Sequence, residues 1–383
     1  MVYLNNAATS YPKPQQVRDA ISEAVCSLPA GQFRGSGVQE AEDLFCACRE
    51  QLGIILGIQK TGRIFFSSGA TESLNSLFAG LELEADNIIT TVTEHNSVLR
   101  PLYNQKNTTK GPLLVPCDEN GFVDPECVRD AAKTMTTATR KAIVLNHCSN
   151  VTGAIQNVQA ISSVAKENGF FFLLDCSQSA GCMPVEADTW GVDALAFTGH
   201  KSLLGLQGTG GHYVRAELPF LPSKFGGTGR DSRKLVYSAA DYEFEPGTQN
   251  GPGIAALKAA CDDVLSRGIQ AVCSSESRLR TLLVDKLEQI RGVRILGAHP
   301  DEKHQYGPVV SFIVKGMKSA DVSYILQNSY GILTRAGLMC APLIHSYLGT
   351  EPDGVVRVSF SPFTKEEELQ ELSEALREIV AAL

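Results

Sequence analysis

Short hydrophobic runs recur along residues 63 to about 215, separated by stretches in which apolar positions return with helical spacing. Short apolar runs bounded by turns are typical of buried strands, and amphipathic stretches between them are typical of helices. Strands that alternate with helices indicate βαβ units around a mostly parallel sheet. We therefore expect an α/β domain whose seven strands lie at residues 64–66, 88–89, 113–115, 143–145, 170–174, 194–197 and 212–214.

The pattern differs on either side of this region. Apolar residues from 17 to 28 have helical spacing and follow a proline-containing segment, 11–14, which we interpret as a hinge. After residue 252 we expect a long helical stretch, strands at 309–314 and 355–360, and a C-terminal helix that opens with Thr364 and Glu367 as a capping box. This predicts a large domain at 16–250 and a smaller α+β domain formed by 1–15 with 251–383.

The length of the chain and its net charge restrict the classes of protein to which it can belong. The 383 residues are 43% hydrophobic, which suits two domains with sizeable cores. The 34 basic and 42 acidic residues give a net charge of −8 without a basic patch. Nucleic acid and anionic membrane surfaces are therefore not expected partners.

Cysteine usage and the N-terminal pattern point to the cytoplasm. The first residues lack the basic and apolar regions of a secretory signal, and no apolar run approaches membrane-spanning length. The eleven cysteines are scattered without a zinc-binding pattern, so we interpret them as reduced thiols and expect no bound metal.

An acid, a carboxamide and an amine follow two of the expected strands. Asp175 and Gln178 come after the strand at 170–174, and Thr198-Gly199-His200-Lys201 follows the strand at 194–197. A pyridine aldehyde cofactor needs a carboxylate for its ring nitrogen, a donor for its phenolic oxygen and an amine for its aldehyde carbon. Taken singly, Asp175 is equally consistent with a helix cap and Lys201 with a solvated loop residue.

Together these residues resemble the pyridoxal 5'-phosphate (PLP) site of class V aminotransferases. That family has an aspartate, a glutamine three residues later and a distant Ser/Thr-x-His-Lys, which here begins at Thr198. The resemblance runs from residue 3 to about 375 and implies the type I fold of PLP-dependent transferases. It implies that Lys201 carries the cofactor and that His200 bonds its phosphate.

Gly69-Ala70-Thr71 precedes an expected helix, where backbone N–H groups favour an anion. A threonine capping a helix is ordinary, but the family places Gly-x-Thr here to hold the PLP phosphate, which implicates Ala70 and Thr71.

The same resemblance implies roles in the site for three further residues. His95 matches the histidine that stacks on the pyridine ring and relays protons. Asn150 ends a strand and reaches either the cofactor's phenolic oxygen or the substrate carboxylate. Thr248 matches a Gly-Thr-x-Asn segment whose threonine contacts the phosphate of the neighbouring subunit. A homodimer with shared sites is the implied assembly.

A late segment indicates which PLP chemistry to expect. Arg335 and Cys340 resemble the Arg-x-Gly-x-x-Cys-Ala element of group II cysteine desulfurases and selenocysteine lyases. Arg357 matches the arginine that binds the substrate carboxylate, a task suited to a bidentate guanidinium. Arg335 belongs to the same substrate site and favours the thiolate of Cys340. Met339 departs from the family, since many members carry histidine there.

The resemblance implies that L-cysteine is converted to L-alanine and that Cys340 keeps the sulfur as a persulfide. Lys201 would remove the Cα proton, and the sulfur would pass to an acceptor protein or a small thiol. Three alternatives remain open: a selenocysteine lyase, a class V aminotransferase without thiol chemistry, and a catalytically silent binding scaffold. Relative rates on cysteine and selenocysteine, dependence on Cys340, and the presence of bound cofactor distinguish them.

Overall fold

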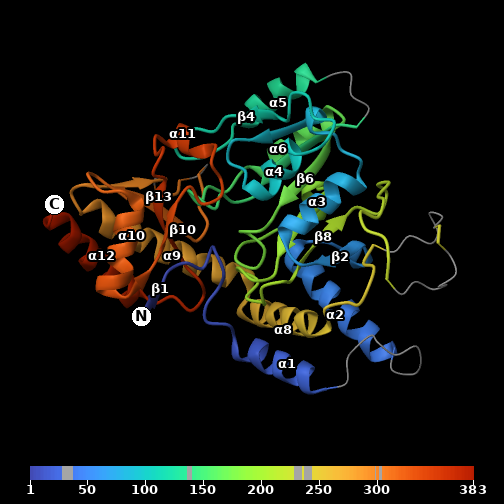
Figure 1. Ribbon diagram of the computed structural model, residues 1–383, viewed down its shortest axis with the longest axis horizontal. Helices are drawn as coiled ribbons and strands as arrows, with labels where there is room; N and C mark the ends of the chain where they lie inside the picture. The colour runs from blue at the N-terminus through green and yellow to red at the C-terminus, as the bar shows by residue number, and fades with distance from the viewer. Residues whose placement is uncertain (28–37, 136–139, 228–234, 237–243, 298, 302–303) are drawn as a thin grey trace.

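Two sheets of different size form the framework of the molecule, as the computed structural model in Figure 1 shows. The structure describes residues 1–27, 38–135, 140–227, 235–236, 244–297, 299–301 and 304–383, and the side chains of 38–43 are outside this description. Both ends of the chain lie beside the smaller sheet (Figure 1).

The larger sheet has seven strands in the order β2-β8-β7-β6-β5-β3-β4. All its neighbouring pairs are parallel except those made by β8, which runs antiparallel to β2 and β7. This confirms the predicted fold class and all seven predicted strands. Their bounds are β2 (Ile64–Ser67), β3 (Ile88–Thr91), β4 (Leu113–Val115), β5 (Ala142–Asn146), β6 (Phe171–Asp175), β7 (Ala194–Thr198) and β8 (Gly210–Val214).

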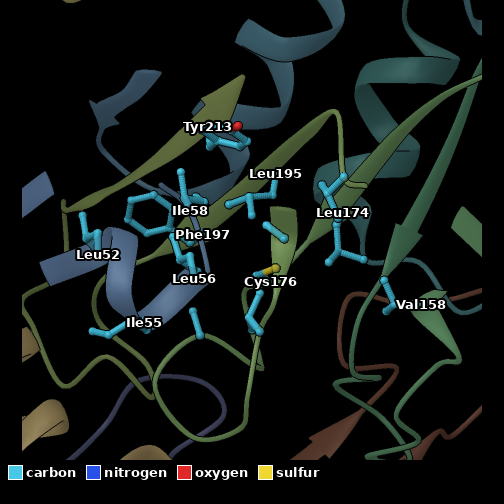
Figure 2. Close-up of a cluster of buried hydrophobic side chains, with 14 of the residues drawn as sticks. Leu52, Ile55, Leu56, Ile58, Val158, Leu174, Cys176, Leu195, Phe197 and Tyr213 are labelled. Carbon is cyan, nitrogen blue, oxygen red and sulfur yellow. The ribbon is translucent and has the colours of Figure 1, made fainter. Parts of the chain in front are cut away.

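Helices cover both faces of this sheet because its strands are apolar on both sides. Along β6, Leu174 points into one hydrophobic cluster and Leu173 into the other, as the two-residue period of a strand requires. Figure 2 shows part of the first cluster, where Leu174, Leu195 and Phe197 of the sheet meet Leu52 and Leu56 of α2. The helices of this part are α1 (Gln15–Cys26), α2 (Val38–Leu56), α3 (Ala70–Gly80), α4 (Asn96–Tyr103), α5 (Pro125–Thr134), α6 (Val158–Glu167), α7 (Ala187–Trp190) and α8 (Gly251–Arg267), with 3-10 turns at Thr61–Arg63 and Ala85–Asn87.

The smaller sheet is antiparallel, in the order β12-β13-β10-β9. A separate short pair joins β1 to β11 in parallel, so the N-terminus packs with the C-terminal third of the chain. These strands are β1 (Val2–Tyr3), β9 (Val293–Leu296), β10 (Val309–Val314), β11 (Ile332–Leu333), β12 (Arg335–Gly337) and β13 (Val355–Ser359). Their helices are α9 (Ile269–Glu288), α10 (Ser319–Tyr330), α11 (Ile344–Leu348) and α12 (Glu366–Ala381).

Helix α8 packs with the larger sheet. Its residues Ile254, Leu257 and Cys261 are buried in the same cluster as Leu174, and the helix lies against α1 and α2 (Figure 1). The domain boundary at 250/251 stays a prediction, and this packing favours a position nearer Gly268, between α8 and α9.

The predicted capping box of the last helix is wrong by one residue. Helix α12 begins at Glu366, and the carboxylate of Glu368 accepts a hydrogen bond from the Lys365 N–H at 2.9 Å. The Thr364 hydroxyl accepts instead from the Ser361 N–H at 3.0 Å, so it is turned away from the helix. Within the described residues, no helix is both long and apolar enough to cross a membrane.

Gly210 allows β8 to approach the start of α3. A Cβ at this position would lie 2.6 Å from the Gly69 Cα and 2.7 Å from the Phe197 carbonyl oxygen. Because backbone atoms cannot yield, Gly210→Ala should lower stability by about 1–3 kcal/mol, the usual cost of overpacking. Thermal unfolding of the cofactor-free protein measures this. Gly62→Ala, where no atom beyond the local backbone lies within 4 Å of the added Cβ, is the control. Equal melting temperatures for the two variants would contradict the close approach.

Candidate active site

A cavity of about 480 Å³ lies where the carboxyl ends of the parallel strands meet the N-terminal segment and the loops of the smaller sheet. Ligands bind at this edge of open α/β sheets. Every predicted site residue except Thr248 lines it: Ala70, Thr71, His95, Asn150, Asp175, Gln178, Thr198, His200, Lys201, Arg335, Cys340 and Arg357.

Asp175 is held at the end of β6. Its Oδ1 accepts a hydrogen bond from the Ser177 N–H at 2.9 Å and another from the Ser177 hydroxyl. Strand register places Asn146, the last residue of β5, directly beside it. The carboxylate is almost fully buried, with 5% of the residue exposed. These contacts fix an anion on the floor of the cavity.

Lys201 lies in the turn after β7. The peptide group before it is hydrogen-bonded to the N-terminal segment. The His200 carbonyl accepts hydrogen bonds from the Ser10 N–H at 2.9 Å and from the Lys13 ammonium at 3.1 Å. Burial lowers the pKa of Lys201 to about 8, against the opposing effect of Asp175. With this pKa, roughly a tenth of the amine is neutral, and hence nucleophilic, at pH 7.

His95 is the N-cap of α4. Its Nδ1 accepts a hydrogen bond from the Ser97 N–H at 3.0 Å, which leaves the ring proton on Nε2. Burial, followed by the charge of Lys201, lowers the pKa of His95 to about 4, so the imidazole is neutral at neutral pH. A neutral ring suits stacking on a cationic aromatic group better than an imidazolium does.

The N-terminus of α3 forms another wall. Gly69 is the N-cap with a φ of 148°, and the first-turn residues Ala70 and Thr71 line the cavity. The nearby Glu72 carboxylate accepts from the Ser68 N–H at 2.8 Å and pairs with Lys224. The free amides of the first turn therefore remain available to an anion.

Arg357 crosses from the smaller sheet into the cavity. It is 3% exposed, its Nη1 donates to the Asn150 carbonyl at 3.0 Å, and its Nη2 donates to the Asn5 side-chain oxygen at 3.1 Å. Its Nε is buried without a hydrogen-bond partner. A carboxylate in the cavity would provide an acceptor for this guanidinium.

Cys340 lies on an exposed turn just after β12. Met339 and Cys340 both have left-handed backbone conformations, with φ of 52° and 58°. Such residues cost about 1–3 kcal/mol each and concentrate at functional sites. The turn is anchored because the Asn96 N–H donates to the Cys340 carbonyl and the Asn150 side chain donates to the Met339 carbonyl, both at 2.7 Å.

Thr248 is exposed, just before α8, and does not line the cavity of its own chain. Its predicted role at a phosphate therefore requires a second copy of the chain. This position stays a prediction.

Several lining residues were not anticipated from the sequence. Ala7 and Ala8 reach the cavity because the Gln178 side chain donates to the Ala7 carbonyl at 3.1 Å. Alanine carries no chemistry of its own, so nothing in the sequence marks it as a site residue. The cavity is also lined by Gly69 and Met339, which flank predicted site residues, and by Ser68, Glu72, Ser97, Asn146, Cys148, Ser177, Gln207 and Gly208.

The residues present fit PLP. Asp175 offers a carboxylate for a ring nitrogen, Lys201 offers an amine, and the α3 N-terminus offers amides for a phosphate. His200 lines the same cavity, and its Nδ1 atom is buried without a hydrogen-bond partner, as expected of a group that binds a polar ligand.

Comparisons with known proteins agree with this geometry. The family model described as aminotransferase class-V matches residues 2–372. A probable cysteine desulfurase of Methanothermobacter thermautotrophicus is 32% identical, and the alignment covers 99% of this chain and 94% of that protein. Probable cysteine desulfurase 2 of Mycobacterium leprae is 31% identical, with 97% and 90% covered.

Solved structures resemble the whole chain. The apo structure of the cysteine desulfurase from Thermococcus onnurineus NA1 is 29% identical, has a TM-score of 0.88, and is matched over 100% of this chain and 95% of that one. The Escherichia coli cysteine desulfurase CsdA, in its S-sulfonic acid form, is 27% identical with a TM-score of 0.85 and the same coverage. The shared fold, the full-length family match and the cavity at the carboxyl edge together show that this chain belongs to the class-V aminotransferase family of PLP-dependent enzymes.

Proposed function

We propose that this chain is a PLP-dependent cysteine desulfurase that converts L-cysteine to L-alanine and forms a persulfide on Cys340. The observation that carries the proposal is that Cys340, Lys201 and Arg357 line one cavity, although they come from three different elements. The relatives named as cysteine desulfurases, which align over nearly the whole chain, support the same activity.

Substrate binding is assigned to the buried Arg357, and removal of the Cα proton is assigned to the buried Lys201. Arg357 binds the amino-acid carboxylate, and Lys201 and Asp175 hold PLP, which supplies an electron sink when bound. The amine of Lys201 accepts the Cα proton, because its lowered pKa lets it act as a base near neutral pH. Neutral His95 would stack over the ring, and its Nε2–H can donate a proton.

Sulfur transfer is assigned to the Cys340 thiolate. Its Sγ attacks the sulfur of the bound cysteine, forming an S–S bond as the substrate C–S bond breaks. Cys340 is left as a persulfide, and protonation of the substrate carbon releases alanine. The anchored left-handed turn holds the thiol at the cavity without a flexible loop.

A homodimer is proposed from Thr248. This residue is exposed and lies outside its own cavity, so a threonine that completes a phosphate site would come from the partner. A two-fold dimer in which each chain supplies Thr248 to the other satisfies this requirement.

The persulfide sulfur is proposed to leave for an acceptor protein or a small thiol. Cys340 is exposed, and the neighbouring Leu338 is 39% exposed, which leaves the turn open to a partner. All eleven cysteines are free thiols, which supports a reducing compartment such as the cytoplasm.

The pKa of Lys201 sets the pH dependence of cofactor attachment. Only the neutral amine attacks an aldehyde, so attachment of PLP to the cofactor-free protein should accelerate as pH rises through about 8. Borohydride trapping at a series of pH values, followed by peptide mass spectrometry, measures this. Lys201→Ala should abolish trapping, and a modified peptide elsewhere would refute the assignment.

Cys340→Ala should stop sulfur removal while leaving PLP bound and its absorbance responsive to added cysteine, because Cys340 does not hold the cofactor. Mass spectrometry of the wild type after brief exposure to cysteine should show one extra sulfur on the Cys340 peptide. Cys127→Ala, which removes an exposed thiol on α5, is the matched control and should behave as the wild type. Sulfide release by Cys340→Ala at the wild-type rate would favour the lyase alternative, and a wild type that converts cysteine to its keto acid without releasing sulfur would favour the aminotransferase.

Mixed dimers test whether Thr248 acts in the partner site. Lys201→Ala and Thr248→Ala chains are each expected to be impaired as homodimers. A mixed dimer should regain about half of wild-type activity, because one of its two sites combines an intact Lys201 with an intact partner Thr248. No regain in the mixed dimer, or full activity of a wild-type monomer in sedimentation experiments, would contradict the shared site.

A further inference from the structure

Glu94 lies directly behind the cavity and is fully buried. Its Oε1 accepts three hydrogen bonds: from the Asn146 N–H at 3.0 Å, from the Asn146 side-chain amide at 3.0 Å, and from the Thr91 hydroxyl at 2.8 Å. Asn146 lines the cavity and pairs in register with Asp175. Glu94 therefore holds Asn146, at the end of β5, in place beside the carboxylate of Asp175. We call these three hydrogen bonds to Glu94 the brace.

The second carboxyl oxygen of Glu94 has no such support. Its Oε2 is buried without a hydrogen-bond partner, and no ion pair between described residues includes this side chain. An ionised carboxylate would leave a charged oxygen desolvated there, at a cost far above that of a neutral hydroxyl. The negative charge of Asp175 on β6 also disfavours ionisation of Glu94. Accordingly, burial raises the pKa of Glu94 to about 8, with Asp175 adding to the effect.

The charged and titratable groups around the cavity complete the electrostatic setting. Asp175 faces it from β6, Lys201 from the turn after β7, His95 from the start of α4 and Arg357 from β13. Its lining also includes Glu72 of α3, His200 before Lys201, Arg335 of β12 and Cys340. Among the described contacts, no hydrogen bond or ion pair joins Lys201, Arg335 or Arg357 to Glu94. A negative charge on Glu94 would therefore have Asp175 as its near neighbour and no partner cation.

We propose that Glu94 is a positioning residue in the form of a neutral carboxylic acid, which holds Asn146 beside Asp175 without placing a second anion behind the cofactor. Asp175 is then the single negative charge available to the ring nitrogen. This inference rests on the proposed PLP-dependent function, because it assigns a purpose to the brace within that site.

Infrared spectroscopy of the cofactor-free protein at pH 6.5 tests the protonation state without relying on activity. The difference spectrum between the wild type and Glu94→Gln should contain the carbonyl stretch of a protonated carboxylic acid. An ionised carboxylate band in its place would overturn the proposal, whether or not the enzyme is a cysteine desulfurase.

The bound cofactor supplies the second readout. Below pH 8, Glu94→Gln replaces one neutral group by another of the same shape, so over that range the pH titration of the PLP absorbance should match that of the wild type. A lower titration midpoint in Glu94→Gln would mean that an anion had been removed, and would also overturn the proposal.

The positioning role is tested by removing the brace. Glu94→Ala leaves the buried Asn146 N–H without its acceptor and the Asn146 side-chain amide with the Thr93 hydroxyl alone, so the protein should lose PLP about tenfold faster in dialysis, and Glu94→Gln should restore retention. If Glu94→Ala does not fold, Glu94→Asp, shorter by one methylene, gives the same test. Retention equal to the wild type in the shortened variant would show that the brace has no role.

Discussion

The in-register pairing of β5, β6 and β7 is the constraint on which the site depends. Parallel strands that share a register also share an edge, so Asn146 lies beside Asp175, and Lys201 follows β7 at the same edge. The hydrophobic clusters on both faces fix this register, since a slip of one residue would turn every buried side chain to the opposite face. The packing of the core thus determines where the charged groups meet.

The larger sheet forms part of the cavity, and the smaller sheet contributes further lining residues. β12, the turn after it and β13 bring Arg335, Cys340 and Arg357 to the cavity that Asp175 and Lys201 also line. Arg357 and the turn at Cys340 are both bonded to Asn150, which comes from the larger part of the chain. A single asparagine therefore links the carboxylate-binding arginine to the thiol turn, and this link favours a fixed distance between the two.

The residues that the sequence predicted well are those with local signals. The seven strands are continuous apolar runs, and Asp175 and Lys201 follow such runs directly, so both their placement and their chemistry were readable. The features that the sequence did not predict depend on contacts between residues far apart in the chain. Ala7 lines the cavity only because the chain folds back onto Gln178, and α8 joins the larger core although it follows the predicted boundary. The cap of α12 moved by one residue because Thr364 bonds backward to Ser361.

The first thirteen residues act as a strap across both parts of the molecule. β1 pairs with β11, Asn5 accepts from Arg357, Ala7 accepts from Gln178, and Lys13 donates to the His200 carbonyl. Val2 and Leu4 of this segment are also buried in the core of the smaller part. A new chain start placed just after Lys13, as in a trimmed expression version or a circular permutant, would therefore remove core packing and cavity contacts together, in contrast to the usual tolerance of protein termini to change.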